Sequence, residues 1–403
     1  MRMSNSSKSD FPIFSKQPKL VYLDSAATAL KPQVVINAVT EYYEQYSANI
    51  HRGIYPMSEK ATEAYEHARE QVANLLHAKS DEVIFTSGTT AGLNQVAVSY
   101  QDILTDTDEV IVPRSEHHAN LLPWQRLTAK TDSNLVVIDH RDLTPQRITK
   151  HINADTSVLA FAHVSNVVGT VSDVVGIAKA VRKVNKNVVI VVDGAQAVPH
   201  LDDDVPALGI DYYAFSGHKI YGPTGIGALW VNKARMDELQ PLTVGGGAIS
   251  TVTDTKYELL KGPQGFEAGT PPIAEAIGMG VAAEYLQEEN REKITDDRLA
   301  TTLYDKLSKL EFVDVIGGEQ GNRIPLVTFT LKGVHAHDVA QFLADRNICV
   351  RAGHHCTMPL HTALDISASV RASLGVYNTS QDIDKLVEAL TACYKQLGLQ
   401  NDK

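Results

Sequence analysis

The sequence predicts an α/β protein: a large domain with a mainly parallel seven-stranded sheet sandwiched by helices, followed by a smaller α+β C-terminal domain. Two observations support this prediction. Between residues 82 and 231, short runs rich in Val and Ile alternate with segments of helical periodicity, which is typical of parallel sheets covered on both faces. From about residue 285 the chain becomes more charged and its apolar runs become shorter, which indicates a second domain.

The elements follow in a regular order. After a polar lead-in of 20 residues, one helix is predicted behind Pro32, which suits a first helical turn, and another from Thr62 to Ala78. The smaller domain is expected to hold strands at 324–331 and 348–351 and a last helix at about 381–397. The predicted strands of the large sheet are EVIFT (82–86), EVIVP (109–113), LVVID (135–139), VLAFAHV (158–164), VVIVVD (188–193), DYYAFS (211–216) and GALWV (227–231).

Composition excludes several classes of protein. The net charge of −11 argues against a nucleic-acid partner. The sequence has no apolar run of the roughly 18 residues that a membrane helix needs, and its polar N-terminus does not resemble a secretory signal. The three cysteines (Cys349, Cys356 and Cys393) are too few for a disulfide framework. We therefore expect a cytoplasmic protein with reduced thiols and no membrane partner.

Three features suggest chemistry. The segment TSGTTAGLN (86–94) joins a strand to a helix and offers backbone N–H groups and hydroxyls to a phosphate. Asp193 ends an apolar strand, where a carboxylate is costly without a cationic partner. Lys219 follows the next strand within SGHKIYGPTGIG (216–227). Taken singly, the loop is equally explained as a plain N-cap with turn glycines, and Asp193 is better explained as a helix cap.

Taken together, the three features are the parts needed to hold pyridoxal 5′-phosphate. Lys219 would bind the cofactor covalently, Asp193 would pair with its protonated pyridine nitrogen, and the loop would hold its phosphate. A nucleotide site is unsupported, because no G-x-x-x-x-G-K-[ST] motif occurs and GPTGIG precedes a strand instead of following one.

The order of motifs along nearly the whole chain resembles the cysteine desulfurases of the SufS type (group II), in the class V aminotransferase family of fold-type I pyridoxal-phosphate enzymes. The resemblance extends from YLDSAATALKP, near residue 22, to VRASLGVYNT (370–379). The motifs between them are NIHRG (49–53), TSGTTAGLN (86–94), EHHANLLPW (116–124), SNVVGT (165–170), DGAQA (193–197), SGHKIYGPTGIG (216–227), EAGTPP (267–272) and RAGHHCTMP (351–359).

This resemblance implies roles for the cofactor residues. Lys219 is the Schiff-base lysine and the base that removes the substrate Cα proton. Asp193 and Gln196 contact the ring nitrogen and the ring oxygen, and His117 stacks on the ring and takes part in proton transfer. The remaining cofactor ligands that it implies are Thr89, Thr90, Asn166, Ser216 and His218, with Thr270 reaching the phosphate of the partner subunit in a homodimer.

The resemblance also implies the substrate site. Asn166 and Arg371 orient the carboxylate of L-cysteine, with Arg351 nearby, and a guanidinium suits a carboxylate because it forms two parallel hydrogen bonds. Cys356 accepts the sulfur as a persulfide. A metal at His-His-Cys is disfavoured because adjacent ligands fit one tetrahedral site poorly. For the H-x-H pair His335 and His337, a solvated loop is favoured over a metal.

The short loop after Cys356 and the stretch 247–269 match group II enzymes, which need an acceptor protein of the SufE or SufU kind; iron–sulfur cluster assembly is one destination for the sulfur. The alternatives on the same scaffold are a selenocysteine lyase and a cysteine sulfinate desulfinase. We expect an N-terminal arm at 1–20 that joins the small domain, a large cofactor-binding domain at 21–290, and a small domain at 291–403 that carries Cys356.

Overall fold

The computed structural model describes residues 7–288, 297–317 and 322–398. Contacts divide the chain into two compact units. The large unit comprises Val34–His163 and Ser172–Glu289, and the small unit comprises Met1–Gln33, Val164–Val171 and Asn290–Lys403. The boundary predicted between residues 290 and 291 lies outside the described residues.

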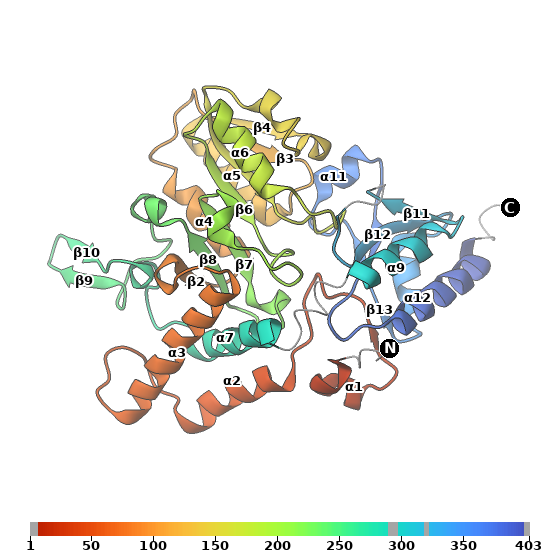
Figure 1. Ribbon diagram of the computed structural model, residues 1–403, viewed down its shortest axis with the longest axis horizontal. Coiled ribbons are helices and arrows are strands. Elements are labelled where there is room, and N and C mark those ends of the chain that lie inside the picture. Colours follow the sequence, from red (N-terminus) through yellow and green to blue (C-terminus); the bar gives the residue numbers. More distant parts are fainter. Residues whose placement is uncertain (1–6, 289–296, 318–321, 399–403) are drawn as a thin grey trace. The chain divides into compact units, whose positions relative to one another are not determined.

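Seven strands form one sheet in the large unit (Figure 1). Neighbouring strands are parallel except at β8, which is antiparallel to both of its neighbours. The predicted mainly parallel sheet is confirmed, and each strand lies within two residues of its apolar run. In order across the sheet the strands are β2 (Val83–Thr86), β8 (Gly227–Val231), β7 (Tyr212–Ser216), β6 (Val189–Asp193), β5 (Thr156–Ala162), β3 (Glu109–Pro113) and β4 (Asn134–Ile138).

Helices pack against this sheet and against one another. α4 and α5 share a buried core with the sheet that includes Leu93, Trp124 and Val191. α3 and α7 lie side by side (Figure 1), and Gly280 permits this close approach because a Cβ there would lie 2.6 Å from Ala68 Cα. The helices of the large unit are α2 (Gln33–Gln45), α3 (Pro56–Leu75), α4 (Thr89–Ser99), α5 (Leu122–Thr131), α6 (Val174–Val184) and α7 (Ile273–Glu288).

A short antiparallel hairpin, β9 (Ile249–Val252) with β10 (Tyr257–Leu259), projects from the rest of the large unit (Figure 1). It lies within the stretch 247–269 that the sequence pattern singled out. Its apolar side chains Val252 and Tyr257 are exposed. Within this chain, therefore, the hairpin buries little apolar surface.

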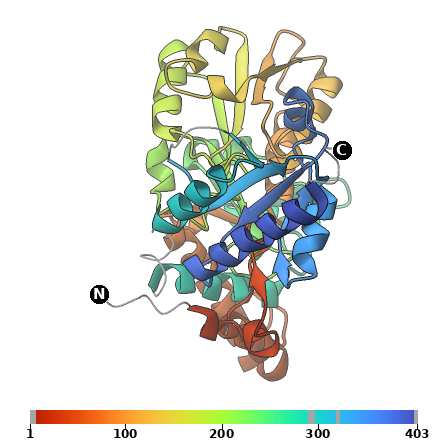
Figure 2. The same ribbon diagram turned by 90° about the vertical axis from the view of Figure 1, so that its right-hand side faces the viewer.

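The small unit is built on an antiparallel sheet in the order β11 (Val313–Ile316), β12 (Leu326–Leu331), β15 (Ser369–Ser373) and β14 (Arg351–Gly353). Helices α9 and α12 lie side by side against it (Figure 2). Leu303, Phe329 and Leu386 belong to their common core. The other elements of this unit are α1 (Pro12–Lys16), α10 (Ala336–Ala344), α11 (Met358–Ala363), α12 (Ser380–Cys393), α9 (Asp297–Ser308), and a parallel pair of β1 (Val21–Tyr22) with β13 (Ile348–Cys349).

The strand directions place the candidate residues of the large unit at one edge of its sheet. β2, β6 and β7 all run in the same direction, because β8 is antiparallel to both β2 and β7. Their carboxyl ends carry the TSGTT loop, Asp193 and Ser216. Ligands of such sheets bind at this edge. Among the described helices, none is long and apolar enough to cross a membrane.

Candidate active site

Asp193 and Lys219 form the charged part of the site in the large unit. Asp193 is buried at the end of β6, and one of its oxygens accepts a hydrogen bond of 2.9 Å from the Ala195 amide. Burial raises the pKa of this carboxyl, and the positive charge of Lys219 opposes that rise. The two groups therefore lie within electrostatic range of each other, although they come from the ends of two different strands.

The predicted phosphate loop is a cradle of hydroxyls at the first turn of α4. Ser216 Oγ accepts a hydrogen bond of 2.8 Å from the Thr89 amide and lies 2.7 Å from Thr89 Oγ1. Gly88 has a φ of 141°, and a Cβ there would lie 3.2 Å from Ser216 Oγ. Thr90 is exposed in the first turn of α4, where N–H groups have no helical partner. An anion fits this cradle, as a cofactor phosphate requires.

His117 begins a short 3₁₀ turn, His118–Asn120, and its ring is held by the backbone. Nδ1 accepts a hydrogen bond of 3.0 Å from the Ala119 amide. Because a nitrogen that accepts carries no hydrogen, neutral His117 has its proton on Nε2. The ring thus offers a donor on its other edge.

Glu116, the residue before His117, is a site residue that the sequence reasoning missed. Its carboxyl is buried and accepts from Asn120 Nδ2 at 2.6 Å and from the Ala162 amide at 3.1 Å. Burial raises its pKa to about 8, and the charge of Asp193 adds to the rise. Asn120 also accepts from Trp124 Nε1 at 3.1 Å. This network anchors the segment that carries His117, and only its tertiary contacts reveal it.

Tyr213 and His163, next to the Asp193–Gly194 turn, form a second group that the sequence reasoning missed. A Cβ on Gly194 would lie 2.2 Å from the Tyr213 ring, so this position requires glycine. The Tyr213 hydroxyl lies 3.0 Å from His163 Nδ1. Burial lowers the pKa of His163 to about 4, so the ring is neutral near pH 7. Gln196 is buried in the turn that follows.

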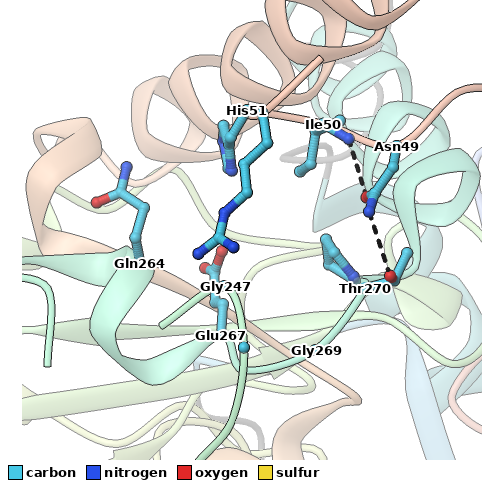
Figure 3. A pocket seen from close by; sticks show the side chains of 11 residues that line it. Asn49, Ile50, His51, Gly247, Gln264, Glu267, Gly269 and Thr270 are labelled. Carbon is cyan, nitrogen blue, oxygen red and sulfur yellow. Dashed lines mark hydrogen bonds between the residues drawn. The ribbon is translucent and has the colours of Figure 1, made fainter. Parts of the chain in front are cut away.

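Thr270 lies at a cavity of about 290 Å³ in the large unit (Figure 3). Asn49 Nδ2 donates to Thr270 Oγ1 at 3.5 Å, and His51 and Arg52 also line the cavity. Neither Lys219 nor Asp193 is among its lining residues. A histidine, an arginine and a threonine hydroxyl in the lining suit an anion, and the charge of the Glu267 carboxylate, which also lines the cavity, is neutralised by Arg69. Thr89 and Ser216 are not among the lining residues, so the cavity is separate from the cradle at Ser216.

The wall of this cavity is fixed by a buried ion pair that the sequence reasoning also missed. Glu267, three residues before Thr270, receives hydrogen bonds from Arg69 at 2.6 and 2.8 Å, from Tyr65 Oη at 2.9 Å and from the Phe85 amide at 2.7 Å. Arg69 is only 2% exposed. The pair joins the EAGTPP loop to α3 and β2.

In the small unit, Arg371 is the candidate carboxylate ligand. It lies in β15 and is buried, and its Nη1 donates to the Asn166 carbonyl at 2.9 Å. Its Nε is buried and has no hydrogen-bond partner among the described residues. Arg351 pairs with Asp24 at 2.9 Å, and Arg371 Nη2 lies 3.6 Å from the same carboxylate. A buried donor without a partner is costly, which points to a ligand at Arg371.

Cys356 lies in a tight loop of the small unit and is exposed. His355 and Cys356 both have positive φ, 51° and 57°, which non-glycine residues rarely adopt. Asn166 Nδ2 donates to the His355 carbonyl at 2.7 Å, so Asn166 joins this loop to Arg371. The hydrogen bond to Asp24 is the main cause of the raised pKa of Arg351, and a negative charge at Cys356 adds a smaller contribution. Burial lowers the pKa of Arg371, and a negative charge at Cys356 opposes that fall. Two cations thus lie within electrostatic range of the thiol.

The other two thiols are less exposed than Cys356, and the histidines form no metal site among the described residues. Cys393 is buried in the core of the small unit, and Cys349 is half-buried. Across the described ranges no group of three or more His, Cys, Asp or Glu side chains is arranged to hold a metal ion. The described geometry of each unit brings Thr89 to Ser216, Asp193 to Lys219, and Asn166 to both Arg371 and the Cys356 loop.

Comparison with known proteins identifies the family to which the chain belongs. The chain matches the aminotransferase class-V family over residues 21–386 and belongs to it. It is 42% identical to a probable cysteine desulfurase of Halalkalibacterium halodurans over 400 residues, covering 96% of this chain and 97% of the relative. It is 41% identical to a cysteine desulfurase of Haloferax volcanii, covering 93% and 89%.

Solved structures agree. A cysteine desulfurase of Escherichia coli superposes with a TM-score of 0.87 at 35% identity, covering 98% of this chain and all of the other. One from Thermococcus onnurineus superposes with a TM-score of 0.91 at 34% identity, with the same coverage. The class V aminotransferase family, the fold class and the assignment to cysteine desulfurase-type enzymes are confirmed, and the finer SufS-type (group II) assignment stays a prediction.

Proposed function

We propose that this chain is a pyridoxal-phosphate-dependent cysteine desulfurase that releases L-alanine from L-cysteine and leaves a persulfide on Cys356. The observation that carries the proposal is the small-unit geometry: an exposed thiol in a constrained loop, joined through Asn166 to a buried arginine. The Nε of that arginine has no partner among the described residues. An enzyme that binds an amino acid by its carboxylate and takes its sulfur needs both groups.

The large unit supplies the groups that suit the cofactor. Lys219 would hold it, Asp193 would pair with the pyridine nitrogen, and His117 and Gln196 would flank the ring. The phosphate would lie in the cradle formed by Thr89, Thr90, Ser216 and His218. When bound, pyridoxal phosphate supplies an electron sink that stabilises negative charge on the substrate carbon.

The residues of the chain then perform the proton transfers. Asp193 as a carboxylate would keep the pyridine nitrogen protonated, and its burial would strengthen that pairing because little water would screen it. Lys219 Nζ takes the proton from the substrate Cα. His117, whose Nδ1 accepts from the Ala119 amide, would stack on the ring and take part in these proton transfers through Nε2.

In the sulfur-transfer step the Cys356 thiolate attacks the sulfur of the substrate. A sulfur–sulfur bond forms, the carbon–sulfur bond breaks, and its electron pair stays on the carbon, which takes a proton to become the methyl group of alanine. Arg371 holds the substrate carboxylate through this step, with Arg351 and Asn166 beside it. The persulfide then passes to an acceptor protein of the SufE or SufU kind, for iron–sulfur cluster or other sulfur-cofactor assembly.

We further propose that the enzyme is a homodimer in the cytoplasm. The anion-suited cavity around Thr270 is separate from the Ser216 cradle, as expected if Thr270 serves the phosphate in the partner's site. Exposed apolar side chains near this cavity and on the hairpin are candidates for burial by a second copy: Ile54, Tyr55, Met57, Val252 and Tyr257. A fully active monomer in solution would contradict this arrangement.

Mass spectrometry after exposure to L-cysteine tests the proposal. The Cys356 peptide should gain the mass of one sulfur, and a Cys356→Ser variant should keep the cofactor's visible absorption but lose desulfuration. Lys219→Ala should lose that absorption. Full desulfuration by Cys356→Ser would refute the role of Cys356. Activity of that variant on selenocysteine or cysteine sulfinate alone would favour the lyase or desulfinase alternative.

A further inference from the structure

A chain of three buried side chains lies behind the Cys356 loop. Ser369, the first residue of β15, is fully buried. Its Oγ lies 3.0 Å from His355 Nε2 and 2.8 Å from His361 Nε2. His355 belongs to the Cys356 loop and His361 to α11, and both rings are buried. One hydroxyl therefore bridges two imidazoles from different elements.

The positions of the protons in this hydrogen-bonded series can be worked out by starting at the Thr357 carbonyl. His361 Nδ1 lies 3.2 Å from the Thr357 carbonyl, which only accepts, so Nδ1 carries a hydrogen. Burial lowers the pKa of His361, which leaves the ring neutral near pH 7 and its Nε2 an acceptor. The Ser369 hydroxyl therefore donates to His361. An alternative acceptor, the Gly353 carbonyl, is farther away at 3.4 Å.

The one hydrogen of Ser369 is then used, so Ser369 accepts from His355 Nε2. Burial, followed by the charge of Arg371, lowers the pKa of His355 to about 2, and this ring is neutral as well. His355 Nδ1 thus carries no hydrogen, and it is buried without a hydrogen-bond partner among the described residues. Every donor and acceptor in the series is thereby assigned: His355 donates to Ser369, Ser369 donates to His361, and His361 donates to the Thr357 carbonyl.

The hydrogen bonds of Ser369 and His361 end at a strained backbone segment. His355 and Cys356 are consecutive residues with positive φ, a conformation that persists only where the surroundings enforce it. The backbone is restrained by Asn166 at the His355 carbonyl and by the Thr357 amide at the His354 carbonyl, 2.9 Å away. These bonds restrain the main chain. The His355 ring is restrained by Ser369.

We propose that Ser369 and His361 are positioning residues for the Cys356 thiol, because their hydrogen-bonded chain to His355 holds the left-handed His355–Cys356 segment in its transfer-ready conformation. This inference rests on the proposed role of Cys356 as the sulfur acceptor. Neither Ser369 nor His361 touches substrate or cofactor in this role. Both act through the loop that carries the nucleophile.

The test compares three variants in single-turnover sulfur transfer to Cys356, followed by mass spectrometry. Ser369→Ala breaks the chain at its centre and should slow the transfer about tenfold, while KM for L-cysteine stays within twofold, because Arg371 is unchanged. Ser369→Thr keeps the hydroxyl and should restore the rate to within threefold of the wild type. Ser99→Ala removes a buried hydroxyl of the large unit that also donates and accepts hydrogen bonds, and it should leave the rate unchanged.

Nitrogen-15 NMR of the wild-type imidazoles gives a readout that does not depend on activity or on the folding of the Ser369 variants. In the wild type, His361 should be the Nδ1–H tautomer and His355 the Nε2–H tautomer, assigned by His361→Asn and His355→Asn. The opposite tautomers, or a Ser369→Ala variant that transfers sulfur within twofold of the wild-type rate, would overturn the inference. If the wild type itself places no sulfur on Cys356, the proposed function fails instead, so the two failures are distinguishable.

Discussion

Replacing Glu116 with glutamine should remove a pH dependence of stability that this carboxyl creates. Glu116 is 1% exposed, and its burial raises its pKa from 4.5 to about 8. Because the folded-state pKa lies above the unfolded value, the folded protein keeps this proton where the unfolded chain has lost it. The stability contribution is fully present below pH 4.5 and is lost as the pH rises to about 8.

The size of the effect follows from the shift. At about 1.4 kcal/mol per pKa unit, the free energy of unfolding should fall by roughly 3–4 kcal/mol between pH 5 and pH 8 because of Glu116 alone. Glutamine cannot ionise, so the variant should lack this fall. Its oxygen still accepts from the Ala162 amide, but its amide cannot accept from Asn120, which costs about 1 kcal/mol at every pH.

Urea unfolding at pH 5, 6, 7 and 8, followed by Trp fluorescence, measures the difference between the two proteins. Asp193 and the buried histidines titrate in both, so the difference reports position 116 together with its electrostatic coupling to Asp193. Glu63→Gln, at an exposed glutamate of α3, is the matched control and should leave the pH profile unchanged. Parallel pH profiles for the wild type and Glu116→Gln would refute the reasoning.

Two further predictions concern arginines. Arg371→Ala should raise KM for L-cysteine about 10- to 100-fold, because charge-assisted hydrogen bonds contribute about 1.5–3 kcal/mol, while the cofactor absorption should persist. Steady-state kinetics measure this change, and an unchanged KM would contradict the prediction. Arg69→Met should lower the free energy of unfolding by about 3–5 kcal/mol, since it leaves the Glu267 charge buried without its partner. Adding Glu267→Gln should recover part of that loss in urea titrations, and a double variant no more stable than Arg69→Met would count against an ion-pair origin.

Much of the fold was predictable because the central strands of the large sheet are buried on both faces. β6, β7 and β8 are buried at every position, so they read as continuous apolar runs that reveal their own ends. Those ends place Asp193 and Ser216 at one edge of the sheet. Their assignment to a cofactor came from combining them with the TSGTT loop and Lys219, and the resemblance to a family then supplied the individual roles.

Polar contacts between distant residues were not predictable. The guanidinium of Arg371 bonds to Asn166, 205 residues away, and the segment Val164–Val171 belongs to the small unit although it lies between two strands of the large one. Sequence spacing carries no information about such pairings, because they depend on how whole elements pack.

The sequence by itself determined the strands, the family and the residue types that chemistry requires, because hydrophobic periodicity and motif order are local properties of a chain. Only the tertiary structure decided the states of those residues: the raised pKa of Glu116, the ion pair of Arg69 with Glu267, and the Ser369 hydroxyl between two neutral histidines. Each depends on burial, and burial is produced by residues far apart in the sequence that exclude water together.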